Sequence, residues 1–184
     1  MASLATIYNM ALARLGLSQV ENINSPDEDS STVAICNRIF PVVLRTVLAA
    51  HDWSFAAKSE QLALLGIDKA SGMCRYQMPS DCVKIIRLEG NPHYTRRGAE
   101  ILTAQERAAL HYVAAIENPD LWPPTFLEAI VWRMAADLAI SLSSDNKKYQ
   151  QCWRNFQEFL YQAVAVDMNE QNPDLTLSNW MEAR

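Results

Sequence analysis

The most constraining feature of the sequence is a pair of apolar stripes near its C-terminal end, each with the 3.6-residue period of an α-helix. The polar residues 143–146 break the pattern between the two stripes, so the spacing predicts two long antiparallel helices with a short connection. Pro123 and Pro124 suit the first turn of the earlier helix, because the missing N–H has no helical partner there. The stripes consist of Phe126, Leu127, Ile130, Val131, Met134, Leu138 and Leu142, and then of Tyr149, Cys152, Trp153, Phe156, Phe159, Leu160, Ala163 and Val164.

Two further helices are expected at the N-terminal end. The first starts after Ser3, its predicted N-cap, and Gly16 is the predicted C′ residue that follows its last turn. The second begins within residues 27–31 and ends near residues 51–52. Pro41 lies inside this helix, and we expect a kink or break there because proline removes a helical hydrogen bond and clashes with the preceding turn. Together with the closing pair, these helices predict a four-helix bundle.

The pattern changes between the two helical pairs. From Trp53 onward, short segments alternate with turn signals, which is typical of strands. A hairpin is predicted with its turn at residues 97–99, and residues 103–109 are compatible with a helical turn. The predicted strands are 61–65, 75–78, 83–88, 94–96, 100–103 and 111–116.

The sequence therefore predicts a mainly α fold with a small β insertion, which is an α+β protein. We expect helices 1 and 2 of the bundle in residues 1–52, the β-rich insertion in 53–121, helices 3 and 4 in 122–168, and an extended C-terminal tail in 169–184. A composition of 49% apolar and 20% charged residues is typical of a globular chain that can bury a core.

The net charge of −5 limits the partners. A dedicated nucleic-acid binder needs an excess of Lys and Arg to contact phosphates, and this chain has none. An acidic protein can still surround DNA that slides past without being held.

Cysteine usage and the N-terminal sequence indicate folding in a cytoplasm. The four cysteines form no CxxC pair, and three lie in apolar periodic segments, which predicts buried free thiols. We find no signal-peptide pattern and no uninterrupted apolar run long enough to span a membrane, so no membrane partner is expected.

No residue pattern points to catalysis. The three histidines match no zinc motif, and no glycine-rich phosphate loop occurs. Cys82, His111 and Asp81 could be drawn as a thiol hydrolase, but any chain with four Cys and three His allows such a drawing. We therefore expect no enzymatic activity, no catalytic residues, no cofactor and no metal site.

Two features are candidate contacts with partners or subunits. Arg96 and Arg97, at the predicted hairpin tip, could touch a nucleic-acid backbone or an acidic surface, or could be an ordinary exposed turn. Trp180 stands with Leu175 and Leu177 in the polar C-terminal tail, where a large aromatic residue suits an interface anchor. The alternative is a tail that folds back on its own domain.

The order of several sequence runs resembles the tail tubular protein A family, the head-to-tail adaptors (connectors) of short-tailed bacteriophages. The resemblance covers roughly residues 5–170. It is carried by Tyr-Asn-Met-Ala-Leu-Ala-Arg-Leu-Gly at 8–16, Ala-Ile-Cys-Asn-Arg-Ile-Phe-Pro at 34–41, His-Asp-Trp-Ser-Phe-Ala-Ala-Lys at 51–58, Tyr-Gln-Met-Pro-Ser-Asp-Cys-Val-Lys at 76–84, Leu-His-Tyr-Val at 110–113, and Ala-Ala-Asp-Leu-Ala at 135–139.

The resemblance implies a structural protein of the virion, made in the host bacterial cytoplasm. Such proteins form a twelve-fold ring beneath the portal protein and extend the DNA channel. They also provide the platform for the tail nozzle (tubular) protein and the tail fibres. Double-stranded DNA would pass through the lumen without sequence-specific binding, and the acidic balance suits such a conduit.

Two other interpretations compete with the adaptor. A small helical bacterial interaction or regulatory module accounts for the composition, but it leaves the runs at 51–58 and 76–84 unexplained. A thiol-dependent enzyme ranks far below both.

Overall fold

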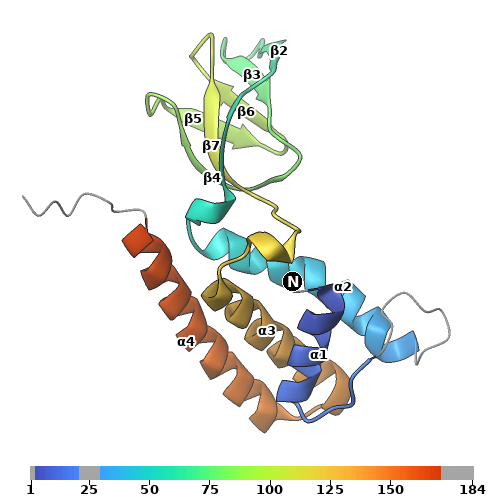
Figure 1. The fold of residues 1–184 in the computed structure, drawn as a ribbon. Helices are drawn as coiled ribbons and strands as arrows, with labels where there is room; N and C mark the ends of the chain where they lie inside the picture. Colours follow the sequence, from blue (N-terminus) through green and yellow to red (C-terminus); the bar gives the residue numbers. More distant parts are fainter. Residues whose placement is uncertain (1–2, 21–29, 171–184) are drawn as a thin grey trace, which may run out of the picture. The chain divides into compact units, whose positions relative to one another are not determined.

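The computed structural model describes residues 3–20 and 30–170 and shows an α+β protein, as the sequence predicts. Within these residues, four α-helices flank two antiparallel β-sheets that lie between α2 and α3 in the sequence (Figure 1). The chain divides into two compact units. The helical unit comprises residues 1–43 and 119–184, and the β unit comprises residues 44–118.

The first helix, α1 (Leu4–Arg14), begins and ends as predicted. The Ser3 hydroxyl accepts a hydrogen bond from the backbone N–H of Thr6 at 3.1 Å, which satisfies one of the free donors at the helix start. Gly16 follows the last turn with φ of +69°, a left-handed conformation that glycine adopts without the clash of a Cβ atom.

The second helix, α2 (Ser30–Ala50), continues through Pro41, so the predicted break is wrong. Pro41 and Asn37, whose backbone carbonyl loses its helical donor at this proline, both lie on the exposed side of the helix. Water can therefore replace the missing donor, and the helix is maintained by its buried face. That face consists of Val33, Cys36, Phe40, Val43, Leu44, Val47 and Leu48.

By length and composition, α2 meets a criterion for crossing a membrane. Its segment Thr32–Ala50 has a mean hydropathy of 1.6 and is long and apolar enough to do so, although Asn37, Arg38 and Arg45 interrupt its apolar run. A buried core helix of a soluble protein meets the same criterion, and the apolar face of α2 packs against protein. Length and composition alone therefore do not distinguish the two cases.

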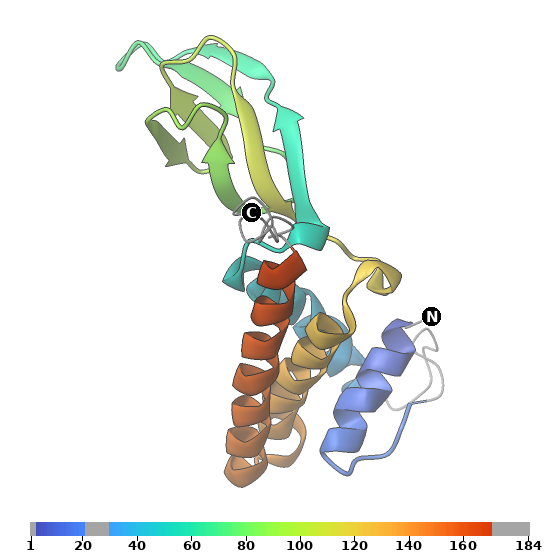
Figure 2. The ribbon, with the colours of Figure 1, turned by 60° about the vertical axis from the view of Figure 1, so that its left-hand side comes forward.

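The closing helices form the predicted antiparallel pair. α3 (Pro124–Leu138) has Pro123 at its N-cap, and α4 (Asn146–Glu170) returns alongside it (Figures 1 and 2). The end of α3 differs from the prediction, because the chain widens into a π-helical turn, η3 (Ala139–Ser143). Ser144 then ends the turn in a left-handed conformation with φ of 49°, inside the predicted connection.

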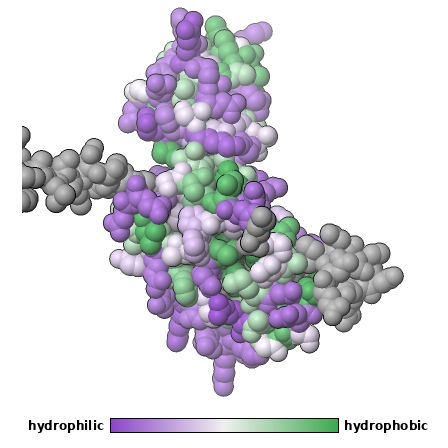
Figure 3. Space-filling model, viewed as in Figure 1, coloured by the Kyte–Doolittle hydropathy of each residue, from purple (hydrophilic) through white to green (hydrophobic). Residues whose placement is uncertain are grey.

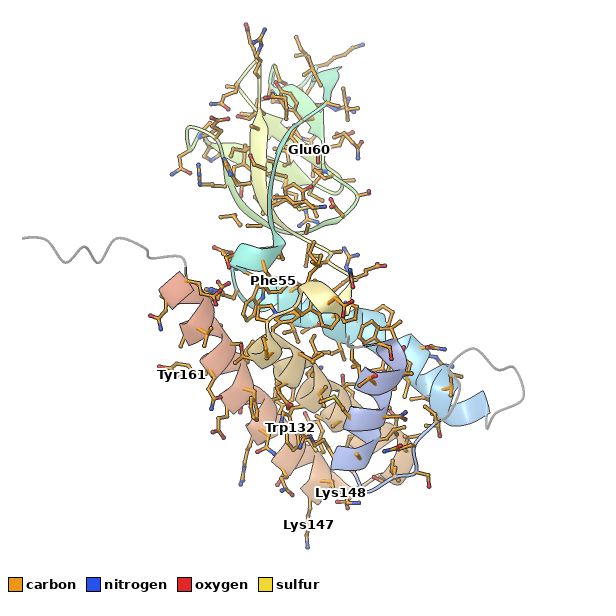
Figure 4. All side chains as sticks on the ribbon, viewed as in Figure 1. Phe55, Glu60, Trp132, Lys147, Lys148 and Tyr161 are labelled. Atoms are coloured by element: carbon orange, nitrogen blue, oxygen red, sulfur yellow. The ribbon has the colours of Figure 1, made fainter. Side chains whose placement is uncertain are left out.

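Side-chain contacts join the other helices of this unit. The Tyr8 hydroxyl of α1 donates a hydrogen bond to Oδ1 of Asn37 in α2 at 2.9 Å. The rings of Tyr8 and Phe40 meet edge to face, with centroids 5.8 Å apart. The Arg14 guanidinium of α1 lies 4.5 Å from the ring centroid of Trp132 in α3. Figure 4 labels Trp132 among the helices of this unit.

The β unit contains two sheets with antiparallel neighbours. One has the strand order β1-β7-β4 and the other β2-β3-β6-β5. A 3-10 turn, η1 (Ser54–Ala56), precedes the first strand, and another, η2 (Pro119–Leu121), precedes α3. The strands are β1 (Ala57–Gln61), β2 (Leu64–Ile67), β3 (Cys74–Gln77), β4 (Cys82–Leu88), β5 (Tyr94–Arg97), β6 (Glu100–Thr103) and β7 (Ala109–Ala114).

Two predictions for this region are wrong. The single strand expected at 61–65 is two strands in different sheets, because β1 ends at Gln61 and β2 begins at Leu64. Between them Leu62 is buried, and its backbone N–H donates to the Ala108 carbonyl at 2.8 Å. The helical turn considered for 103–109 is absent. In this segment the backbone carbonyl of Gln105 accepts a hydrogen bond from the Tyr76 hydroxyl of β3 at 2.7 Å.

The predicted hairpin is confirmed. Arg97 of β5 pairs with Glu100 of β6 across a two-residue turn, and Gly98 in that turn has φ of +62°. The core of the β unit lies between the strands and includes Leu62, Tyr76, Met78, Cys82, Leu88, Ile101, Ala108, Leu110, Tyr112 and Ala114.

Candidate functional site

An exposed apolar strand edge is the most distinctive surface of the β unit. β2 lies at an edge of the four-stranded sheet, and β3 is its only neighbour among the described strands. Leu64, Leu65 and Ile67 of this strand are exposed, Ile67 to 65%. We call these three residues the β2 edge surface. Figure 3 shows hydrophobic side chains at the end of the β unit where Figure 1 labels β2. A partner strand can extend such an edge, which is otherwise prone to aggregation.

A register shift explains how consecutive leucines become exposed. Leu64 pairs with Tyr76 and Gly66 pairs with the preceding residue, Arg75, so Leu65 is an extra residue on this strand. Such a bulge interrupts the strict alternation of strand side chains between the two faces. The prediction of one continuous strand at 61–65 therefore missed this surface.

The predicted arginine pair lies on β5, and its charge is partly neutralised within the chain. The Arg97 guanidinium forms an ion pair with Asp68 at 3.3 Å, although its side chain stays 62% exposed. Arg96 donates from Nε to the Gly98 carbonyl at 3.2 Å. Hydrogen bonding from Ser71 and the nearby Arg97 charge hold the pKa of Asp68 below its usual value. The hairpin tip is thus basic without being an isolated cationic site.

A second ion pair neutralises charge on the neighbouring strands. Arg75 of β3 binds Glu100 of β6 in a bidentate arrangement, with Nε–Oε2 and Nη2–Oε1 distances of 3.0 and 2.8 Å. This hydrogen bonding lowers the pKa of Glu100. Paired donors that already bind a carboxylate have less capacity to grip a phosphate.

A buried tyrosine connects two carboxylates in the other sheet. The Tyr112 hydroxyl of β7 lies 3.1 Å from Oε2 of Glu60 and 3.0 Å from Oδ1 of Asp81. Lys58 Nζ donates to the second Asp81 oxygen at 2.6 Å. Burial, followed by the hydrogen bonds to the two carboxylates, raises the pKa of Tyr112. This phenol therefore stays protonated, and the cluster links β1, β7 and the turn before β4 (Glu60 is labelled in Figure 4).

The structure does not bring the hypothetical thiol site together. Cys82 pairs with Ala114, whereas His111 pairs with Arg87, which lies five residues further along β4. Burial raises the pKa of the Cys82 thiol, so the reactive thiolate is disfavoured. The described cysteines are all free, and Cys36, Cys82 and Cys152 are buried, as predicted.

Two exposed apolar surfaces stand out among the described residues of the helical unit. One is the outer face of α4, where Tyr161, Ala165 and Met168 are exposed at helical spacing; we call it the α4 outer surface. Tyr161 is 78% exposed and points away from the unit (Figure 4). The other is a groove of about 450 Å³, which we call the α2–η3 groove. Its lining consists of Arg38, Ile39, Val42, Asp137, Ile140 and Ser141.

The remaining predicted contacts, Leu175, Leu177 and Trp180, lie outside the described residues. Sequence reasoning missed the β2 edge surface, the α4 outer surface and the α2–η3 groove, because an apolar residue in a periodic segment is normally assigned to the core. For α4, a signal was available: Tyr161 and Met168 are not members of the predicted stripe and lie to one side of it.

No group of His, Cys, Asp or Glu suited to hold a metal ion occurs in residues 3–20 and 30–170. The arrangement is that of a protein with several exposed apolar surfaces and internally paired charges. A comparison of the chain with protein-family models and with curated proteins finds no match in either set.

Proposed function

We propose that this chain is a virion structural protein, the head-to-tail adaptor of a short-tailed bacteriophage related to the tail tubular protein A family. Twelve copies would form a ring beneath the portal protein, extend the DNA channel, and carry the tail nozzle and fibres. The observation that carries the proposal is the exposure of large apolar side chains on separate surfaces of both units, including Ile67 and Tyr161. Exposed apolar patches mark surfaces that partners cover in an assembly.

The charge arrangement supports a passive role toward DNA. The net charge is −5, and the ion pairs of Arg97 with Asp68 and of Arg75 with Glu100 reduce the cationic character of the hairpin region. A channel wall that does not collect phosphate contacts lets DNA slide. The separation of Cys82 from His111 in the β4–β7 register supports a non-enzymatic role.

We also propose that α1–α4 act together as a four-helix bundle that packs against neighbours in the ring. The pairing of α3 with α4 and the contacts of Tyr8 with Asn37 and Phe40 support this arrangement. The β unit would then face tail components through the β2 edge surface, because a strand edge suits extension by a partner strand.

The direct test is mass measurement by light scattering, for the chain alone and mixed with its candidate portal ring. We expect one copy of the chain to join per portal subunit. A matched mixture with the portal of an unrelated phage controls for adhesion through apolar surfaces. A chain that ignores its candidate portal while its circular dichroism spectrum shows an intact fold would favour the regulatory-module interpretation instead.

The C-terminal prediction is tested in the same assay. Deleting residues 171–184 should leave a folded monomer that fails to join the ring, if Trp180 is the anchor. Trp180→Ala in the full chain separates the aromatic side chain from the rest of the segment. Normal assembly of both variants would exclude an anchoring role for Trp180.

A further inference from the structure

The α2–η3 groove combines apolar walls with one uncompensated cation. Val42 and Ile140 line the groove, and their side chains are 63% and 47% exposed. Its apolar wall is therefore accessible to a partner. Arg38 stands at its rim, exposed and without an ion-pair partner among the described residues. A ligand segment that fits this groove should carry an apolar side chain and an acidic group about one helical turn apart, since Arg38 and Val42 are one turn apart.

The acid in the groove is already partly compensated. Asp137 forms an ion pair with Arg133 one turn earlier on α3, at 3.3 Å, and its side chain is 27% exposed. The groove therefore presents the Arg38 charge more strongly than the Asp137 charge to an incoming segment.

The outer side of α4 has the complementary pattern. Arg154 and Glu158 are exposed on successive turns of this helix, and Tyr161 and Met168 follow on the same face. Glu158 accepts a hydrogen bond from Gln162 at 3.3 Å, a long contact that leaves its charge available. Glu158 and Tyr161 are thus an acid and a large apolar side chain one turn apart. They complement the base Arg38 and the apolar Val42, which are also one turn apart.

We propose that the α4 outer surface of one copy docks in the α2–η3 groove of a second copy. Tyr161 would fill the apolar part of the groove beside Val42 and Ile140, and Glu158 would face Arg38. A helix laid into an apolar groove through residues at i, i+3 and i+7 is a common mode of recognition. Charge complementarity fixes the register of such a contact.

The two surfaces are different, so the contact is head to tail. A heterologous contact of this kind generates a ring when the rotation between subunits closes. The inference thus rests on the proposed adaptor function and names the subunit contact that would build its ring. It also fits the helical unit alone, since every residue used belongs to that unit.

Disulfide trapping between two variants tests the contact. Val42→Cys and Tyr161→Cys are made in separate full-length chains that both carry Cys74→Ser, because Cys74 is the described cysteine that is not buried. Mild oxidation of the mixture should give a covalent dimer containing one copy of each variant. Neither variant alone should give that product, and a Val42→Cys chain mixed with a Glu106→Cys chain is the matched control.

Charge reversal gives the specificity of the contact. Arg38→Glu or Glu158→Arg, introduced into both trapping chains, should each lower the trapped yield roughly fivefold, and introducing both reversals into both chains should restore it. Arg107→Glu makes the same charge change on the β unit and should leave the yield unchanged. Single reversals without effect, or no recovery in the double variant, would overturn the assigned register.

Trapping is carried out on the free chain and again on the portal-bound ring, so that the two proposals can fail separately. A ring with one copy per portal subunit but no trapped pair would overturn this inference and leave the adaptor function standing. A trapped pair with no portal binding would leave the contact standing and remove the adaptor. The Val42→Cys thiol could also be protected from oxidation only when residues 171–184 are present, or only when the portal is present. Either result would assign the groove to that occupant and overturn the proposal.

Discussion

Removing the hydroxyl of Tyr112 should weaken the β unit in a pH-dependent way. Tyr112→Phe keeps the ring, which is only 1% exposed, so the packing is retained and the hydrogen bonds to Glu60 and Asp81 are lost. A hydrogen bond to a charged group contributes about 1.5–3 kcal/mol. One phenol proton is shared between two acceptors, and the Asp81 side chain is 33% exposed. We therefore take the low end, about 1.5 kcal/mol, or roughly tenfold in the opening equilibrium.

The pH dependence follows from Asp81. Burial would raise the pKa of this carboxyl, but hydrogen bonds from Lys58 and Tyr112 outweigh that effect and the pKa is lowered. A carboxyl with a lowered folded pKa stabilises the fold above its unfolded pKa of about 3.9, and this contribution is lost as the pH falls through the folded pKa. The cost of Tyr112→Phe should therefore be full at pH 6–7 and should shrink below about pH 4.

Hydrogen exchange of peptides covering β1, β4 and β7 measures the local opening free energy directly. Tyr94→Phe is the matched control, because Tyr94 is partly buried against the same core and no hydrogen bond of its hydroxyl occurs within the described residues. The reasoning fails if both variants cost the same at pH 7. It also fails if the cost of Tyr112→Phe is undiminished at pH 3.

Three other substitutions test features of the fold. Pro41→Ala restores a helical N–H at an exposed site and should raise the melting temperature, with a gain of up to about 3 kcal/mol; an unchanged or lower temperature would mean that α2 needs its proline. Gly98→Val forces a β-branched residue to φ of +62° and should cost about 1–2 kcal/mol in urea unfolding, whereas Gly98→Asn should be nearly neutral. Arg14→Gln removes the contact with the Trp132 ring and the ion pair with Glu128 at 3.1 Å. It should lower the free energy of unfolding by about 1 kcal/mol in thermal unfolding, and by less at high salt. A loss that does not depend on salt would mean that only the contact with the Trp132 ring contributes to stability.

The helix ends could be predicted because their determinants are local. A serine before an apolar stripe caps α1 through its own neighbours, and Gly16 ends it by its own φ. The Pro123–Pro124 start of α3 is equally local. The π-helical turn at 139–143 could not be predicted in this way, because the apolar stripe up to Leu142 fits a regular helix equally well.

The arrangement of the sheets depends on contacts that are distant in sequence. The sequence predicts Leu62 inside a single strand. In the structure its backbone N–H donates to the Ala108 carbonyl, at the point where the chain passes from one sheet to the other. Whether Leu64 and Ile67 are buried depends on which strand is at the edge, and no local pattern encodes strand order. The same limit applies to the groove, since Val42 and Ile140 lie in separate helical segments whose periodicity predicts burial.

The division of the helical unit into residues 1–43 and 119–184 has a consequence for synthesis on the ribosome. At about 5–20 residues per second, several seconds pass between the emergence of Phe40 and that of Trp122, against which it stacks. During this interval the segment Thr32–Ala50, with its mean hydropathy of 1.6, has no α3 to cover it. Closing an unstructured loop over residues 44–118 would cost about 4 kcal/mol of chain entropy. The β unit shortens that loop when it folds, because β1 and β7, its first and last strands, pair directly from Ala57 with Val113 onward. Early folding of the β unit should therefore set how quickly the newborn chain buries the apolar face of α2.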